Sequence, residues 1–237
     1  RLVPTFLGAH AVTAEFRDDP RGYLRFLMQE VLPKIQGKVE FVDIFCEKKV
    51  FSAWQSKKYL KFAKKLGFKL KIHGEQISRL GACKMAGKLG AVSCDHCDHM
   101  TDRDIKKLSK MNTVCVLLPL VRLFLKEDGC ADGRKMIDFG LPIAVATDFN
   151  PGTAPSKNIF LAMSLACLEM GLNFEEVLTA VTINAASALN LSDKIGSLEK
   201  GKMADIAIFD VDDYKEIPYW LGENLVKKVI IGGKVVK

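Results

Sequence analysis

The stretch Lys69-Leu70-Lys71-Ile72-His73-Gly74 decides the fold class of this chain. Side chains alternate along it, so that Leu70 and Ile72 share one face while Lys71 and His73 share the other, as in a β-strand. Helical periodicity precedes and follows this stretch. A strand set between two helices is the repeating unit of a parallel α/β sheet.

The same alternation of short apolar runs and longer helical segments extends outward in both directions. Two helical stretches, Ser156–Met170 and Asn173–Leu189, follow the last of these runs, and Asn173 is a suitable N-cap. Helix starts are predicted at Pro20 and at two capping boxes, Ser52 with Gln55 and Thr101 with Asp104; helix ends are predicted at Gly67 and Gly90. The predicted strands are Leu2–Ala9, Glu40–Glu47, Lys69–Gly74, Ala91–Asp95, Thr113–Leu118 and Ile143–Thr147.

The pattern changes near Leu191 to short strands separated by glycine turns. The sequence therefore predicts two domains: an incomplete α/β barrel over residues 1–190 and part of a small β subdomain over residues 191–237. Its predicted strands are Ile195–Leu198, Ala204–Phe209, Val226–Ile231 and Lys234–Val236.

Six strand–helix units are two short of the eight that close a (β/α)8 barrel. The chain also opens inside an apolar strand without a methionine. We therefore expect strands three to eight of such a barrel, in a fragment that lacks its N-terminal segment. An open six-stranded parallel sheet is the alternative.

The composition of this chain argues against several classes of function. The chain has 237 residues, 49% of them hydrophobic and 27% charged, and a formal charge of +7. Its lysines are spread along helical segments, which indicates a solvated face rather than nucleic-acid binding. No apolar run approaches the roughly 20 residues that span a bilayer. Seven scattered cysteines favour a reducing compartment, so we expect a cytoplasmic protein without a membrane segment.

Histidines and one aspartate follow the ends of several predicted strands. His10 and His73 end two strands, His96 follows a third, and Asp148 follows the sixth. Each alone is explained by a structural role, such as a core hydrogen bond or a cap. Together they are typical of a divalent zinc or iron site, because the carboxyl ends of parallel strands meet at one mouth.

The segment Cys94–His99 allows a different interpretation. Its Cys94-x-x-Cys97 pair beside two histidines is compatible with structural zinc or with thiol exchange. No second such pair occurs in the sequence. We expect the remaining cysteines to be small core residues.

Several motifs together resemble the imidazolonepropionase family of amidohydrolases. The resemblance covers essentially the whole chain, and Asp43–Glu47 and Thr147–Thr153 are its more specific parts. The motifs are Phe6–Val12, Val42–Glu47, Lys71–Gln76, Ser93–His96, Val116–Pro119, Ala146–Thr153, Thr182–Ala186 and Ile195–Asp205.

The resemblance implies a metal-dependent hydrolase barrel with one zinc or iron ion. It places His73 and Asp148 among the metal ligands, Asp148 also as a proton shuttle, and His96 as general base or oxyanion stabiliser. The remaining ligands in the family form a His-x-His pair on the first strand, and this sequence has no such pair. We expect activity only when the missing segment is present.

The implied reaction opens the ring of 4-imidazolone-5-propanoate, a small anionic heterocycle, to give N-formimidoyl-L-glutamate in histidine degradation. The predicted substrate contacts are His10, Gln76 and the loop residues Asn150, Gly152 and Thr153; the alternative for that loop is a plain turn. Glu75 is either a nearby carboxylate in the reaction or a helix-start residue. The resemblance also implies a homodimer in the intact protein. Alternative functions are another cyclic amidohydrolase or aminohydrolase, or an inert fragment with an incomplete metal site.

Overall fold

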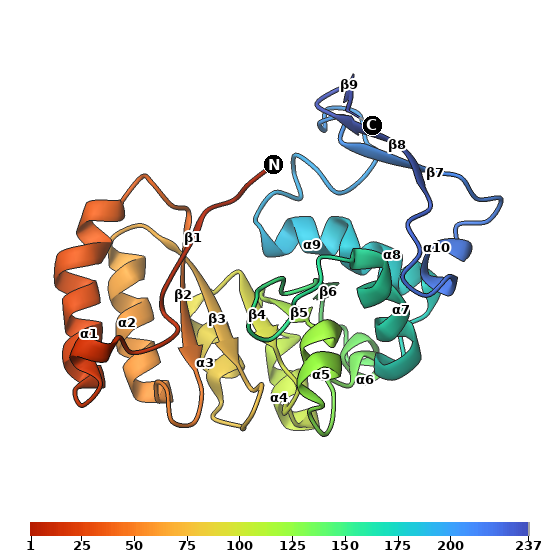
Figure 1. Ribbon diagram of the computed structural model, residues 1–237. Helices are drawn as coiled ribbons and strands as arrows, with labels where there is room; N and C mark the ends of the chain where they lie inside the picture. Colours follow the sequence, from red (N-terminus) through yellow and green to blue (C-terminus); the bar gives the residue numbers. More distant parts are fainter. Residues whose placement is uncertain (237) are drawn as a thin grey trace. The chain divides into compact units, whose positions relative to one another are not determined.

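Strands and helices alternate along the chain, as the sequence predicts. The structure is a computed structural model and describes residues 1–236 (Figure 1). Within that range six strands form one sheet in the order β1-β2-β3-β4-β5-β6, and three more form a separate sheet in the order β7-β8-β9. The first sheet confirms the α/β class. Its strands follow one another in chain order and are joined by helices, because parallel neighbours need such crossover connections. The chain divides into two compact units, Arg1–Cys115 and the part from Val116 onward, and each is described by itself.

The first unit holds the parallel pairs β1-β2, β2-β3 and β3-β4. Predicted strand positions are confirmed, and the predicted bounds of the third are those observed. Helix α2 begins at the predicted capping box, in which the side chains of Ser52 and Gln55 each accept a hydrogen bond from the backbone N–H of the other residue. Strand β5 lies beside β4, where the N–H of Val114 donates to the Val92 carbonyl. The elements are β1 Thr5–Ala9, η1 Ala14–Phe16, α1 Pro20–Phe26, η2 Leu27–Val31, η3 Leu32–Ile35, β2 Phe41–Cys46, α2 Ala53–Lys65, β3 Lys69–Gly74, α3 Ala82–Leu89, β4 Ser93–His96, α4 Asp102–Leu108 and the start of β5 Val114–Leu117.

The core of this unit lies between the strands and the helices that follow them. Helix α2 packs on β2 and α3 packs on β3. Ile44 and Ile72 from the strands are fully buried, as are Tyr59 and Leu60 of α2. Each such side chain contributes about 1.5–3 kcal/mol of transfer free energy. This packing fixes the two strands that carry the polar side chains described below.

Gly74 is required where β3 turns into the loop before α3. A Cβ atom placed on Gly74 would lie 2.5 Å from the Cβ of Ala82, the first residue of α3. That is far inside van der Waals contact, so only glycine lets the helix start this close to the strand. The end of β3 is therefore held directly against α3.

The second unit contains the end of β5, helices α5 Pro119–Leu125, α6 Gly133–Asp138, α7 Ile159–Met170, α8 Phe174–Val181 and α9 Ile183–Ala188, strand β6 Ile143–Val145, and the C-terminal elements. The N–H of Ala146, after β6, donates to the carbonyl of Leu117 in β5. Asn173 caps α8, as predicted, and also forms a capping box with Glu176. The predicted single helix over Asn173–Leu189 is two helices, because Thr182 leaves the helical region with φ −116° and ψ −97°.

The C-terminal elements are β7 Ile206–Phe209, α10 Glu216–Tyr219, β8 Val226–Ile231 and β9 Lys234–Val235. Strands β7, β8 and β9 pair antiparallel, which agrees with three of the four predicted strands. The strand predicted over Ile195–Leu198 is wrong. Gly196 there has φ +94° and lies against the start of α9, so the backbone bends and cannot join a sheet ladder.

The predicted boundary at residue 190 between a barrel and a small β subdomain stays a prediction. No helix within residues 1–236 is long and apolar enough to cross a membrane.

Candidate active site

A hydrogen bond between His73 and Asp43 is the centre of the polar cluster in the first unit. His73 comes from the end of β3 and Asp43 from the middle of β2, and the pair Phe45↔His73 sets the register between these strands. His73 Nδ1 lies 2.9 Å from Asp43 Oδ2, and the Asp43 side chain is 1% exposed. A proton on Nδ1 that is donated to Asp43 places the lone pair of the neutral ring on Nε2, the arrangement found in many carboxylate–histidine–metal sites.

His10, which follows β1, completes this cluster. Its ring centroid lies 4.6 Å from that of His73 at an angle of 74°, and its Nε2 lies 3.6 Å from Asp43 Oδ1. Both of these atoms are buried and have no hydrogen-bond partner within residues 1–236. Two unsatisfied buried atoms of opposite chemical character, a nitrogen and a carboxylate oxygen, are unusual in a folded protein.

These residues fit a divalent metal ion. In the described part of the chain, His10, Asp43 and His73 form the group that could hold one, each offering a ligand atom within 4.8 Å of the others. Imidazole nitrogens with a carboxylate oxygen are a ligand set for zinc or iron. An ion there would also satisfy the unpaired atoms of His10 and Asp43.

The electrostatics favour an ionised Asp43. Burial by itself raises the pKa of Asp43, but the charge of His73 and the neighbouring imidazoles of His10 and His73 outweigh burial and hold this pKa well below its usual range. The carboxylate is therefore charged at neutral pH and available to orient an imidazole or to bind a cation.

A second chain of polar groups runs along the neighbouring strand. Lys71 Nζ donates to Ser93 Oγ at 3.0 Å, and Ser93 Oγ donates to Asp95 Oδ1 at 2.7 Å. The other oxygen of Asp95 lies 3.7 Å from His73 Nδ1. Lys71 and His73 thus share the interior face of β3, as the alternation of side chains predicts.

His96 ends β4 beside this cluster. Its ring centroid is 5.3 Å from that of His73, and its buried Nδ1 has no hydrogen-bond partner in the described residues. Burial, reinforced by the charge of His73 and opposed by that of Asp43, lowers the pKa of His96 well below its usual value. His96 is therefore neutral at pH 7. Its φ of +80° is unusual for a residue other than glycine, and such conformations are concentrated at functional sites.

Two glutamates fix the loop that carries Gln76. The carboxylate of Glu47 accepts from the backbone N–H groups of Gln76 and Ile77, at 3.2 and 3.0 Å. Glu75 accepts from the backbone of Leu80, Ala82 and Cys83, so its role at the start of α3 is confirmed. Gln76 is buried, with 8% of the residue exposed. Its contact with substrate stays a prediction.

In the second unit, Asp148 follows β6 and has φ +50°, again in the left-handed region. The Asn150 amide donates to the backbone carbonyl of Asp148 at 2.7 Å and to Thr153 Oγ1 at 2.9 Å. The carbonyl oxygen of Asn150 accepts from the backbone of Gly152 and Thr153. The loop is thus a turn closed by its own asparagine, and the predicted substrate contacts of Asn150, Gly152 and Thr153 remain predictions.

All seven cysteines are free thiols. Cys83 Sγ lies 3.6 Å from Cys97 Sγ, and Cys97 Sγ donates to the Cys94 carbonyl at 3.4 Å. Within residues 1–236 no thiol belongs to a group that could hold a metal. The interpretation of Cys94–His99 as a structural zinc site therefore has no support, and these thiols are core residues.

Asp43 is the residue of this cluster for which the sequence predicted no role. An acidic residue in the middle of an otherwise apolar strand, Phe41-Val42-Asp43-Ile44-Phe45, is the signal that marks it. Such a group is rarely buried unless it is paired.

Comparisons with known proteins show the family of this chain. The amidohydrolase family model matches residues 52–236, and the chain belongs to this family. Among its relatives, the chain is similar to the imidazolonepropionases of Alkaliphilus metalliredigens, with 44% identity over 99% of this chain, and Bacteroides fragilis, with 47% identity over 98%. In both cases the chain spans about half of the relative, 56% of its length.

Solved structures support the fold. An adenosine deaminase from Xanthomonas campestris with bound zinc gives a TM-score of 0.74 at 17% identity, over 98% of this chain and 60% of that one. An atrazine chlorohydrolase mutant from Arthrobacter aurescens, complexed with zinc and atraton, gives 0.70 at 17% identity, over 90% and 55%.

Proposed function

We propose that this chain is part of an imidazolonepropionase, which hydrolyses the cyclic C–N bond of 4-imidazolone-5-propanoate to N-formimidoyl-L-glutamate. The observation that supports this most directly is the identity of 44–47% with imidazolonepropionases over almost the whole chain. The chain covers about half of those relatives, and the activity is that of the whole enzyme.

The polar cluster supports a metal-dependent hydrolysis. Nε2 of His73 would bind the ion while Asp43 holds the other ring nitrogen and so fixes the direction of the lone pair. A bound zinc or iron ion would lower the pKa of the attacking water and polarise the substrate carbonyl. The resemblance adds Asp148 as a further ligand and proton shuttle.

His96 is best suited to hydrogen bonding in its neutral form. A histidine whose pKa lies well below its usual value is a weak base, but its N–H remains a donor to an oxygen that gains negative charge. We therefore favour the role of oxyanion stabiliser over that of general base for His96.

His10 occupies a position suited to either a ligand or a substrate contact. Its Nε2 is buried beside Asp43 and unsatisfied within residues 1–236, so a substrate polar group or an ion would gain a hydrogen bond or a ligand there. We retain the cytoplasm as the proposed location, a homodimer as the proposed assembly, and a small anionic heterocycle rather than nucleic acid as the proposed partner.

The test is turnover of 4-imidazolone-5-propanoate, followed by loss of the imidazolone absorbance, in the full-length enzyme loaded with zinc or iron. We expect His73→Ala and Asp148→Ala to abolish turnover. His99→Ala is the matched control, because His99 is exposed and outside the cluster. Absence of turnover in the metal-loaded parent enzyme would move the substrate to another ring, and full activity of His73→Ala would refute the assigned site.

A further inference from the structure

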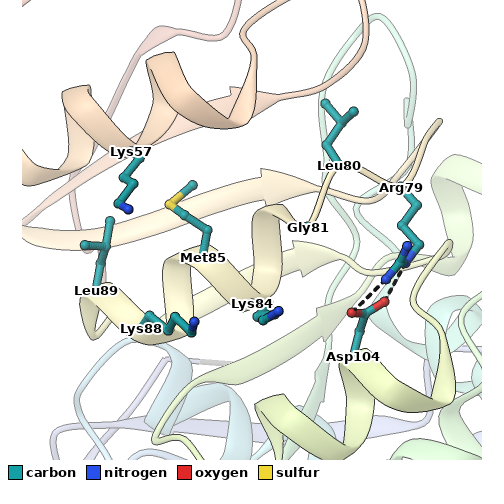
Figure 2. Close-up of a pocket in the computed structure, with 9 residues that line it drawn as sticks. All are labelled: Lys57, Arg79, Leu80, Gly81, Lys84, Met85, Lys88, Leu89 and Asp104. Carbon is teal, nitrogen blue, oxygen red and sulfur yellow. Dashed lines mark hydrogen bonds and ion pairs between the residues drawn. The ribbon is translucent and has the colours of Figure 1, made fainter.

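A basic pocket lies on the helical side of the first unit and is not used by the proposed reaction. It has a volume of about 450 Å³ and is lined by residues from α2, from α3 with the loop before it, and from α4. Figure 2 shows Lys84 and Lys88 on α3, with Lys57 approaching from another element. A pocket of this volume is within the range of small-molecule sites.

The pocket carries uncompensated positive charge. Its acidic residue, Asp104, is already engaged by Arg79, whose Nε and Nη2 lie 2.6 and 3.1 Å from the two carboxylate oxygens (Figure 2). No ion pair is found for Lys57, Lys84 or Lys88 anywhere in residues 1–236. Three lysines thus line one concave space without a carboxylate of their own.

These cations also crowd one another. Lys84 and Lys88 are four residues apart on α3, so their side chains lie on the same face, where like charges disfavour the helix. Beside the pocket the pKa of Lys107 is lowered, by partial burial first and then by the charges of Arg103 and Lys84. A bound anion would relieve this repulsion.

The rest of the lining is apolar, and the helix amides are occupied. Met85 and Leu89 lie along α3 between the lysines, and both are half-buried. The backbone N–H groups at the start of α3 already donate to Glu75. Binding would therefore depend on the lysine ammonium groups, with an apolar surface beside them for a ring.

We propose that this pocket binds a phosphorylated small molecule of the nucleoside diphosphate class, with the phosphates on Lys57, Lys84 and Lys88 and the base on Met85 and Leu89. Ammonium groups bind phosphate as point charges, and several of them around one concavity match a ligand with two or more negative charges. The proposal does not depend on the hydrolase activity.

Calorimetric titration of the purified protein with adenosine diphosphate, at low and at physiological salt, tests this proposal. We expect a dissociation constant below about 1 mM at low salt, weaker binding as salt rises, and no binding of adenosine, which lacks the phosphates. The double variant Lys84→Gln/Lys88→Gln should weaken adenosine diphosphate binding by about tenfold or more.

The matched control is Lys61→Gln/Lys65→Gln, which removes the same charge from exposed positions of α2 outside the pocket. We expect it to leave the affinity unchanged, with circular dichroism confirming that both double variants fold. Equal losses in the two double variants, no measurable binding of adenosine diphosphate, or equally tight binding of adenosine would each overturn the proposal.

Discussion

Asp43 lies beside both His10 and His73 at the centre of the candidate site. A carboxylate that is 1% exposed is costly to bury, and it is tolerated only when neighbouring groups compensate its charge. Here His73 donates one hydrogen bond and His10 lies just beyond hydrogen-bond distance. The arrangement orients His73 more strongly than packing alone would.

Asp43→Asn should therefore weaken metal binding without unfolding the protein. The substitution keeps the shape but removes the charge that holds His73 Nδ1. We expect a loss of about 10–100-fold in zinc or iron affinity, with a parallel loss of turnover. The measurement is metal content against free metal concentration, with the exposed Glu40→Gln as the control. Unchanged affinity in Asp43→Asn would show that this carboxylate does not orient a ligand.

The lowered pKa of His96 predicts a pH dependence of stability. In the unfolded chain His96 protonates near pH 6.5, whereas in the folded protein burial keeps it neutral to a lower pH. The unfolded state then binds more protons, so the free energy of unfolding falls as pH decreases below about 6.5. The contribution reaches at most about 1.4 kcal/mol per pH unit.

Denaturant unfolding at pH 7.5, 6.5 and 5.5 measures this slope. We expect His96→Gln to have a shallower slope than the parent, while His99→Gln, at an exposed position, keeps the parent slope. Identical slopes in all three proteins would mean that His96 protonates in the folded state as readily as in the unfolded chain.

The sequence predicts which residues belong to the site, but not the distances between them. His10, His73 and His96 are recognisable as strand-end histidines, because strand positions follow from local periodicity. Their distances depend on register, such as Phe45↔His73 and the shift between β1 and β2, which periodicity does not encode. An acidic residue in the apolar strand marks Asp43 as a group that must be paired, but its partner His73 is fixed only when β2 and β3 pair.

At the scale of elements, the junction of β3 and α3 is the most constrained part of the first unit. Gly74 allows the close approach of Ala82, and Glu75, with φ +56°, turns its carboxylate onto the start of the helix. Three backbone N–H groups donate to that carboxylate. The same few residues therefore end the strand, cap the helix and hold His73 in place.

Glu75→Ala should destabilise the protein by about 3 kcal/mol or more, because it leaves buried N–H donors unsatisfied. Glu75→Gln keeps one oxygen acceptor and should cost roughly half as much. Urea denaturation provides the measurement, with Glu30→Ala as a surface control expected within about 0.5 kcal/mol of the parent. A cost for Glu75→Ala as small as that of Glu30→Ala would contradict the capping role.

Helices that begin at a side-chain cap were the elements most accurately predicted from the sequence. The capping residues Ser52, Thr101 and Asn173 begin helices as expected, because such caps act locally. One failed prediction, a strand over Ile195–Leu198, concerns a segment whose conformation is set by contact with α9. Tertiary contacts of that kind override local β propensity.

At the scale of the whole molecule, metal binding and folding should be linked. An ion that binds only the folded protein stabilises it by about 2.7 kcal/mol at a free concentration of 100 times its dissociation constant. For a chain of this size that corresponds to roughly 5–10 °C in the midpoint of thermal unfolding.

Thermal unfolding of the metal-loaded protein with and without a chelator tests this linkage. We expect the chelator to lower the midpoint in the parent and to have no effect in His73→Ala. A midpoint that does not move when metal analysis shows complete removal would contradict a metal centre built on His73.

The reactivity of the seven cysteine thiols can report local unfolding of this chain. Cys46, Cys83, Cys94, Cys97 and Cys115 are buried and all lie in the first unit, whereas Cys130 and Cys167 are half-buried and lie in the second. A thiol reagent should label Cys130 first in the native protein. Cys167 should react more slowly, because burial raises the pKa of its thiol to about 11, and the other five thiols should react only during transient unfolding. Mass spectrometry of the labelled peptides over time would therefore report how often the first unit opens, without any engineered label.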